Sequence, residues 1–188
     1  RMGGEMKYNR NMYNDIYSKE DFAFFWGHTP LKSGRISASC MSQWWLCEFT
    51  DGDITYNCAE QYMMYHKALT FGDAEYAEKI LQSTDQKQIK DYGRLIRNFD
   101  GEKWDKVKTD IVINGNKLKF SQNPELKEYL LSTGDRILVE ASPYDKIWGI
   151  GMRNGEDGCT EPARWKGQNL LGFALMEVRD YLFQMRLN

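Results

Sequence analysis

The chain has 188 residues, enough for one domain that buries a large core without disulfides or a structural metal. Aromatic residues make up 14% of it, which indicates either a large core or a pocket for a flat or sugar-like ligand. The formal net charge of −2 excludes a protein that holds nucleic acid chiefly by neutralising many phosphates, so any nucleic-acid target must be recognised locally.

The cysteines and histidines show no zinc-like spacing, and we expect reduced thiols, no metal and no cofactor. No apolar run is long enough for a membrane span, and no signal-peptide pattern opens the chain, so we expect a cytoplasmic protein. The first residues, RMGGEM, are typical of a cloning remnant or a loosely ordered start. We expect an N-terminal extension over residues 1–20, followed by one domain over residues 21–188.

The predicted elements begin with a short strand from Asp21 (DFAFFW). The stretch WWLCEFTDGDITYN predicts a β-hairpin, because Asp51-Gly52 supplies the positive φ angles that a tight turn needs. A helix capped by Asn57 follows and ends near Gly72.

The remaining pattern is mostly helical. Thr84 is the predicted cap of one helix, and a β-branched run followed by Gly115 weakens another. Further helices are expected over residues 73–81, 84–96, 103–120, 124–131 and 170–183, with a strand over 136–140 and mostly loop over 142–166. The sum is an α+β fold: a single compact, mostly helical domain with a few short strands.

The helix after Asn57 mixes charge with methionine and aromatic side chains on one face. Glu60 and Lys67 are nearly two turns apart, so both lie on one stripe, separated by about 10 Å along the axis. Glu60 could close a capping box with Asn57, and Lys67 could extend its ammonium into water. Alternatively, both charges face an apolar pocket and take part in chemistry.

Three further stretches carry candidate residues, and each has an ordinary structural explanation. In EASPYDKIWGIG, Asp145 precedes Trp148, and two glycines could admit a ligand close to the backbone, or the stretch is a plain turn with a core tryptophan. In KGQNLLG, Asn169 could cap a helix whose N–H groups bind phosphate. Trp44 could fill the core, and Arg94 could lie at the surface.

In this order, these segments resemble the NADAR family, which includes the riboflavin-intermediate N-glycosidases. The resemblance covers roughly residues 22–182. The stretches that carry it are SQW (42–44), TYNCAEQYMMYHKALTFGD (55–73), YGRLIRNFDGEKWD (92–105), LKFSQNPELKEYLLSTGDRILVEASPYDKIWGIG (118–151) and GQNLLGFALMEVRD (167–180).

The resemblance implies a largely helical α+β fold and hydrolysis of N-glycosidic bonds. One branch of the family cleaves phosphorylated ribosylamine intermediates of riboflavin synthesis, and another removes ADP-ribose from the exocyclic amine of guanine. The forms SQNPELKEYLLSTGD and ASPYDKIWGIG are similar to the second branch, whereas Cys47-Glu48 stands where the family often has proline. The expected partner is therefore ADP-ribosylated guanine in DNA or a nucleotide, or else a phosphorylated ribosylamine.

Cleavage of a ribosyl C–N bond needs a carboxylate near the anomeric carbon, an activated nucleophile and a proton donor. Glu60 fits the first role. Lys67, if desolvated, could attack the sugar or form a Schiff base, or as a cation it could hold phosphate. Asp145 is the second acid. The expected substrate-binding residues are Trp44, Arg94, Trp148, Gly149, Gly151 and Asn169.

Two other classes of function stay open from the sequence. A non-catalytic reader of ADP-ribose would bind the same ligand without releasing a base, although a pure anion binder gains little from a carboxylate at Glu60. A scaffold domain would use its aromatic side chains as a surface patch, and the loop position of Asp145 and Trp148 argues against it.

Overall fold

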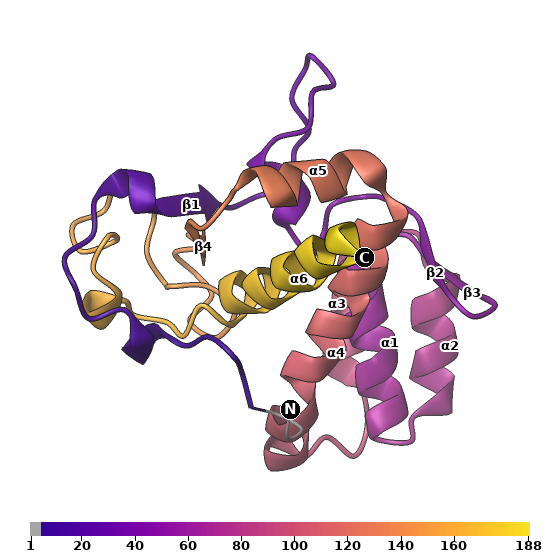
Figure 1. Ribbon diagram of the computed structural model, residues 1–188. Helices are drawn as coiled ribbons and strands as arrows, with labels where there is room; N and C mark the ends of the chain where they lie inside the picture. Colours follow the sequence, from indigo (N-terminus) through magenta and orange to yellow (C-terminus); the bar gives the residue numbers. More distant parts are fainter. Residues whose placement is uncertain (1–4) are drawn as a thin grey trace. The chain divides into compact units, whose positions relative to one another are not determined.

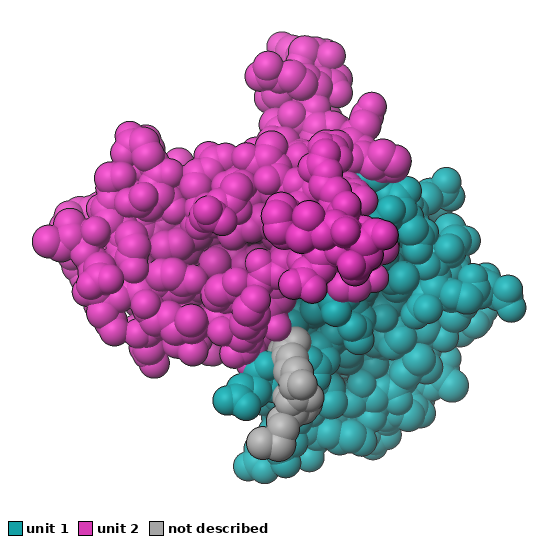
Figure 2. Space-filling model, viewed as in Figure 1, with its two compact units in different colours: residues 1–5, 43–123 teal, residues 6–42, 124–188 magenta. Residues whose placement is uncertain are grey.

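The computed structural model describes residues 5–188, which divide into two compact units (Figures 1 and 2). Unit 1 contains Gln43–Asn123, and unit 2 contains Met6–Ser42 and Pro124–Asn188. Each unit combines helices with one pair of short strands, so the predicted helix-dominated α+β class is confirmed. Residues 1–4 of the expected extension lie outside the described residues.

Unit 1 is a β-hairpin followed by helices. The two strands pair antiparallel, and Gly52 takes a φ of 58° in the turn, which confirms the predicted hairpin. The elements are β2 (Phe49–Asp51), β3 (Ile54–Tyr56), α1 (Ala59–Thr70), α2 (Ala74–Gln82), α3 (Gln86–Leu95) and α4 (Gly101–Gln122).

Two predicted helix caps in unit 1 are wrong. Cys58, not Asn57, is the N-cap of α1, and its side chain makes no capping bond, while the Asn57 N–H before it donates to Gln61 Oε1 at 2.8 Å. Asp85, not Thr84, caps α3, where its carboxylate accepts the N–H of the third helical residue at 3.1 Å. At the start of α1, the Gln61 side chain thus bonds to the incoming backbone.

α4 runs unbroken through the β-branched run and Gly115. A Cβ added at Gly115 would lie 2.5 Å from Tyr62 Cδ1, so the glycine makes room for a ring from α1. Tyr62 in turn belongs to a buried cluster with Phe49 and Tyr56 of the hairpin. Packing against this cluster outweighs the weak local helix preference of the sequence.

Unit 2 is built around two parallel strands, paired from Phe22↔Ile137 to Phe25↔Glu140. The predicted strands and the last helix are confirmed, the helix running four residues further than expected, to Leu187. The elements are η1 (Arg10–Met12), η2 (Lys19–Asp21), β1 (Phe22–Phe25), η3 (Ala38–Met41), α5 (Pro124–Ser132), β4 (Ile137–Glu140), η4 (Pro162–Arg164) and α6 (Leu170–Leu187).

Asn169 joins α6 to β4. It stands at the N-cap position as predicted, but its backbone is left-handed (φ 54°) and its side chain does not cap the helix. Instead, Nδ2 donates to Leu138 O at 2.9 Å and Oδ1 accepts from Glu140 N at 3.0 Å. Gly172, one turn along, lies so close to the strand that an added Cβ would be 2.1 Å from Leu138 O.

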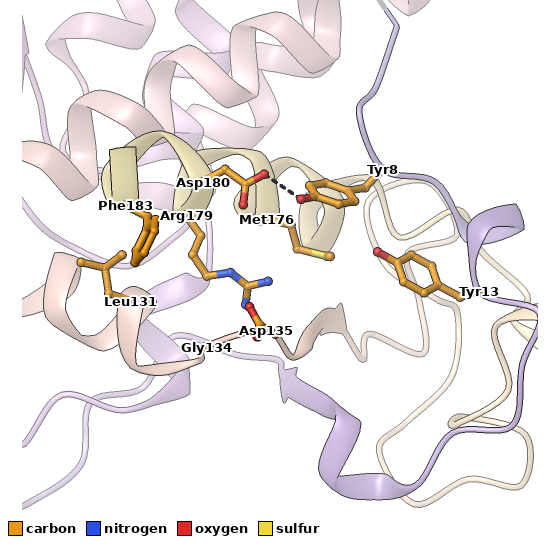
Figure 3. Close-up of a pocket in the computed structure, with 9 residues that line it drawn as sticks. All are labelled: Tyr8, Tyr13, Leu131, Gly134, Asp135, Met176, Arg179, Asp180 and Phe183. Carbon is orange, nitrogen blue, oxygen red and sulfur yellow. Dashed lines mark hydrogen bonds between the residues drawn. The ribbon is translucent and has the colours of Figure 1, made fainter. Parts of the chain in front are cut away.

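Residues before β1 also pack on unit 2. Tyr13 stacks on Phe173 with ring centres 6.0 Å apart, and the Tyr8 hydroxyl donates to Asp180 at 2.6 Å. The segment thus forms part of the wall of a cavity of about 390 Å³ beside α6 (Figure 3).

The buried Arg179 side chain reaches from α6 into that cavity (Figure 3). Its Nη1 donates to Thr133 Oγ1 at 2.9 Å and to Arg136 O at 2.8 Å. Burial lowers the pKa of Arg179, while Asp180 and Asp135 act in the opposite direction. The guanidinium is therefore a structural tie between α6 and the turn that connects α5 to β4.

We expect Gly172→Ala to lower the free energy of unfolding by about 2 kcal/mol, because the new methyl group must displace either α6 or β4. Gly101→Ala is the matched control, since its Cβ would meet only Phe99 Cε1 at 3.9 Å in a helical position. Urea denaturation followed by circular dichroism measures both variants. Equal stabilities would contradict the close approach of α6 to β4.

Candidate active site

The Lys67 ammonium in unit 1 lies among aromatic rings and a carbonyl. Nζ donates to Gly93 O at 3.0 Å, and it lies 4.9 Å from the ring centre of Phe99 and 5.8 Å from that of Trp104. We call these three groups, the Gly93 carbonyl and the rings of Phe99 and Trp104, the Lys67 cage. The side chain is half-buried, so it does not simply extend into water.

Close packing from α1 and α3 forms this cage. A Cβ at Gly93 would lie 2.2 Å from Met64 Sδ, so only glycine lets the Gly93 carbonyl come this close to α1. Phe71, at the end of α1, meets Phe99 edge-on with ring centres 5.2 Å apart. The apolar stripe predicted around Lys67 thus exists, and rings from further along the chain complete it.

Two opposing effects set the pKa of Lys67. Burial lowers it from its ordinary value of 10.5, and the negative charge of Glu60 on the same helix face raises it. Burial is the larger effect, so the amine loses its proton more readily than a surface lysine does. This combination of a carboxylate and an easily deprotonated amine can support nucleophilic chemistry.

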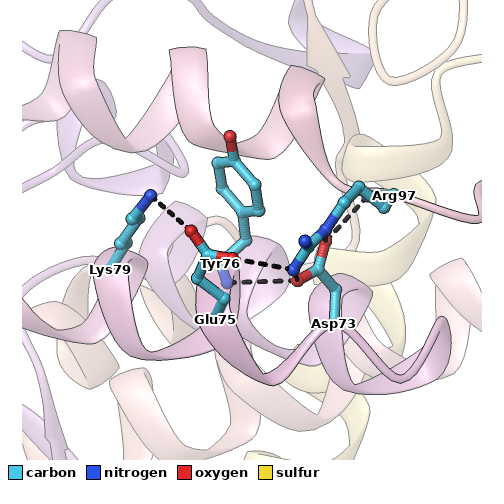
Figure 4. Close-up of polar contacts among 5 residues, drawn as sticks. All are labelled: Asp73, Glu75, Tyr76, Lys79 and Arg97. Atoms are coloured by element: carbon cyan, nitrogen blue, oxygen red, sulfur yellow. Dashed lines mark hydrogen bonds and ion pairs between the residues drawn. The ribbon is translucent and has the colours of Figure 1, made fainter.

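An ion pair between Asp73 and Arg97 holds the chain two residues before Phe99 (Figure 4). The Asp73 carboxylate is buried and accepts from Arg97 Nη2 at 2.7 Å, Arg97 Nε at 3.1 Å and Arg97 N at 2.8 Å. Tyr76 N also donates to it, at 3.3 Å. These bonds hold the pKa of Asp73 well below its usual range, chiefly through the Arg97 side chain, and they tie the chain after α3 to the start of α2.

Buried polar side chains of α4 and of the chain before the hairpin lie near Glu60. Glu60 N donates to Gln43 O at 2.9 Å, and Asn116 Nδ2 donates both to Gln43 Oε1 and to Val112 O, each at 2.8 Å. Gln43 Nε2 and Asn116 Oδ1 are left without a partner within residues 5–188. Lys119, one turn along α4, is fully buried.

The Asp145 carboxylate closes a turn in unit 2. Its Oδ1 accepts from Ile147 N at 2.9 Å and from Trp148 N at 2.8 Å, and Asp145 N donates to Ser142 Oγ at 3.2 Å. The turn explanation that the sequence left open is thus realised. Trp148 is half-buried, and its indole makes no ring contact within the part of the chain described.

Gly149 and Gly151 are required by contacts within the chain. A Cβ at Gly149 would lie 2.9 Å from both Asp145 O and Glu140 O, and Gly151 has a φ of 66°. Gly149 O accepts from Asn169 N at 3.1 Å. At these glycines, where the sequence predicted a close approach of a ligand, the loop itself comes close to β4 and α6.

The N-terminus of α6 is already occupied by this loop. Leu170 N donates to Ile147 O at 3.2 Å and Leu171 N to Trp148 O at 3.1 Å. The polar atoms of the Asn169 side chain are likewise used by β4. A phosphate at this helix end would have to compete with the loop carbonyls, so we see Asn169 as a residue that positions the loop.

The other expected binding residues lie in unit 1. Trp44 is half-buried, and its carbonyl accepts from Gln86 Nε2 at 2.5 Å. Arg94, in the last turn of α3, is exposed and lies 4.0 Å from Asp91. The structure thus gathers Glu60, Lys67 and the groups of the Lys67 cage in unit 1, and it holds the residues from Asp145 to Asn169 in one loop-and-helix assembly of unit 2.

Sequence reasoning missed four residues: Gln43, Phe99, Trp104 and Asn116. Three of them stand inside stretches that already carried the resemblance, beside Trp44 or close after Arg94. Their contact with Lys67 or with the start of α1 depends on long-range packing. Only the recurrence of aromatic residues in RNFDGEKW could have drawn attention to the cage.

Among residues 5–188, no cluster of three or more histidine, cysteine or carboxylate side chains is arranged to hold a metal ion. None of the helices in the same range combines the length and the apolar character needed to cross a bilayer.

The fold and the paired groups on α1 define a class: α+β proteins with a half-buried lysine and a carboxylate on one helix face. The NADAR domain family matches residues 24–183, and the chain belongs to this family. It is 45% identical over 166 residues to N-glycosidase R617 of Acanthamoeba polyphaga mimivirus, a match that covers 86% of this chain and 96% of that protein.

Two further proteins are similar. Riboflavin biosynthesis protein PYRR, chloroplastic, of Arabidopsis thaliana is 38% identical over 128 residues, which are 68% of this chain and 17% of that protein. The NMR structure of the E. coli protein YbiA superposes with a TM-score of 0.70 at 26% identity, covering 92% of each chain. The family and fold implied by the sequence motifs are therefore confirmed.

We expect Lys67 to have a pKa below 10.5. Glu60→Gln should lower this pKa further, because the variant removes the charge that stabilises the ammonium. NMR titration of ¹³C-methylated lysines measures both values. Trp104→Ala should move the pKa back toward that of a surface lysine by admitting water. A rise of the Lys67 pKa in Glu60→Gln would contradict this arrangement.

We expect Asp73→Ala to lower the free energy of unfolding by about 2 kcal/mol, because it removes a buried carboxylate that accepts the backbone N–H groups of Tyr76 and Arg97 as well as the Arg97 side chain. Since the folded-state pKa of Asp73 is depressed below 3.8, its stabilisation is present above about pH 4 and is lost as the pH falls. The free energy of unfolding of the variant should therefore change less as the pH falls below about 4. Glu75→Ala, which removes an exposed partner of the same arginine, is the control and should change little.

Proposed function

We propose that this protein hydrolyses a ribosyl C–N bond and that its substrate is ADP-ribose attached to guanine, in DNA or in a nucleotide. The protein is an enzyme of the class that acts on N-glycosyl bonds, the class in the name of its relative R617. The observation that carries the proposal is the half-buried Lys67, held in its cage on the same face of α1 as Glu60.

In the proposed reaction, the neutral Lys67 amine attacks the anomeric carbon of the ribose. The bond from that carbon to the guanine nitrogen breaks, and the guanine amine leaves with a proton from an acidic side chain or from water. The adduct opens to an imine, to which water adds, and its hydrolysis releases ADP-ribose and restores the amine. The Glu60 carboxylate stabilises the positive charge that develops on the sugar.

Other residues of each unit have proposed roles of their own. Gln43 and Asn116 offer a buried amide donor and acceptor next to the start of α1, a pair suited to ribose hydroxyls. Asp145, whose Oδ1 closes its own turn, would use Oδ2 for a hydroxyl or as the second acid. In unit 1, Trp44 would stack on a ring and Arg94 would bind phosphate, and in unit 2 Trp148 would stack on a ring. Gly149, Gly151 and Asn169 would shape the loop.

The contacts of Lys67 also support a non-covalent role for it as a cation. The Gly93 carbonyl and the two rings favour the charged ammonium, which could hold a phosphate or the ribose without a covalent step. The two roles differ in the direction of the pH dependence. A neutral nucleophile gains activity as the pH rises toward the pKa of Lys67, whereas a cationic anchor loses it.

The second candidate function is hydrolysis of phosphorylated ribosylamine intermediates of riboflavin synthesis. Its specific support is the 38% identity to the riboflavin biosynthesis protein PYRR. A panel of ADP-ribosylated guanine DNA, ADP-ribosylated guanosine nucleotide and phosphorylated ribosylamines compares the two by kcat/KM. A chain that binds ADP-ribose and releases no base from any of these would instead be a non-catalytic reader.

We expect Glu60→Gln and Lys67→Met each to reduce kcat at least about 100-fold while the fold is kept, because each removes a group that acts on the reacting sugar. Release of free guanine or of ADP-ribose, followed by liquid chromatography, measures the rate. Lys103→Ala is the matched control, since Lys103 is an exposed lysine whose Nζ lies 5.7 Å from the Phe71 ring centre. Wild-type rates in both folded active-site variants would refute the site.

Covalent participation of Lys67 has a separate readout. Borohydride added during turnover should fix a sugar adduct on Lys67 if an imine forms, and peptide mass spectrometry would locate it. An active enzyme without any adduct, whose activity falls as the pH rises, would favour the cationic role instead.

A further inference from the structure

A cavity of about 390 Å³ lies at the carboxyl ends of the two parallel strands of unit 2. Its lining includes Phe24, Phe25 and Trp26 from the end of β1, Ala141 just after β4, and Arg153 and Asn154 from the loop before η4. Ala141 N donates to Phe25 O at 2.9 Å, so the strand pairing continues to the edge where the cavity opens. Ligands of α/β proteins often bind beyond this end of parallel strands.

Trp26 gives this cavity an exposed aromatic wall. Its side chain is 50% exposed, although tryptophan usually buries more of its surface. Tyr144, on the loop after β4, contacts the indole with ring centres 6.0 Å apart and planes at 58°. Since Tyr144 does not itself line the cavity, it supports the indole and leaves part of that ring for a ligand.

Arg153 supplies a cation without a fixed partner at the same cavity. Within residues 5–188 it forms no ion pair. The Glu156 carboxylate accepts from the Arg153 backbone N–H at 3.0 Å but pairs with Lys166, at 3.1 Å. A guanidinium left in this state can donate two parallel hydrogen bonds to the edge of a base or to phosphate oxygens.

We infer that this cavity binds the nucleobase of a nucleotide, with the base stacked on Trp26 and its edge or nearest phosphate at Arg153. Its volume lies within the range of small-ligand sites, and it joins an aromatic surface to an uncommitted guanidinium. The inference rests on the proposed function for the identity of the ligand and extends it, because it assigns base recognition to a separate set of residues. The base is either the adenine of ADP-ribose or the target guanine.

Calorimetry with three probes tests the inference: ADP-ribose, GMP and ribose 5-phosphate, which lacks a base. We expect Trp26→Ala to weaken binding of the recognised nucleotide about 10-fold, since stacking of one base contributes on this order. Affinity for ribose 5-phosphate should stay unchanged. Arg153→Ala should act in the same direction, and the probe that responds identifies the base.

Tyr181→Ala and Arg35→Ala are the controls, because they remove an exposed ring and an exposed arginine elsewhere in unit 2. Unchanged affinity of Trp26→Ala for both nucleotides, with the fold intact, would overturn the inference. An equal loss for ribose 5-phosphate would overturn it as well, because the effect would then not depend on a base.

Binding is measured in the Glu60→Gln background, so its outcome is independent of catalysis. If nucleotide binding depends on Trp26 but the wild-type chain releases no base in the activity assay, the proposed hydrolysis is refuted and the base site is kept. Conversely, normal hydrolysis with no effect of Trp26→Ala would keep the enzyme and reject the base site.

Discussion

The Lys67 cage depends on the ion pair between Asp73 and Arg97. Asp73 is the N-cap of α2, directly after the Gly72 turn that follows α1, and its buried carboxylate binds both the side chain and the backbone N–H of Arg97. That double attachment fixes the path of the chain just before Phe99. Phe99 can then meet both Phe71 and the Lys67 ammonium. A flexible segment there would leave the amine in water with the pKa of an ordinary lysine.

Within the cage, opposing effects act on the protonation of Lys67. Rings and a carbonyl attract the ammonium, while burial disfavours its charge, and Glu60 on the same helix face works against burial. A fully buried amine would lose its proton more readily still and would attract an anion poorly. A fully exposed one would stay protonated and be a weak nucleophile. A half-buried lysine near a carboxylate can serve both needs within one catalytic cycle.

Local signals were sufficient for most of the fold. The Asp-Gly turn predicted the hairpin, and the helix expected over residues 124–131 is α5, because each depends on residues a few positions apart. The predicted cap at Thr84 was wrong because the next residue, Asp85, makes the capping bond. The predicted cap at Asn57 was wrong because α1 begins one residue later, after Cys58, which makes no capping bond through its side chain. Glu60 and Lys67 could be paired by helical spacing. The rings around Lys67 could not, since they come from beyond α3 and contact it only after the helices pack.

In unit 2, the motif glycines have a structural use that bears on recognition. The turn closed by Asp145, the backbone at Gly149 and the side chain of Asn169 bond to one another and to β4, so the loop after the strand has little freedom. Tyr144 belongs to this loop and supports Trp26 at the strand edge. A ligand that stacks on Trp26 would therefore meet a surface ordered before it arrives, and binding would not carry the entropy cost of ordering a mobile loop. Residues that first resembled ligand contacts can thus aid recognition by keeping other residues in place.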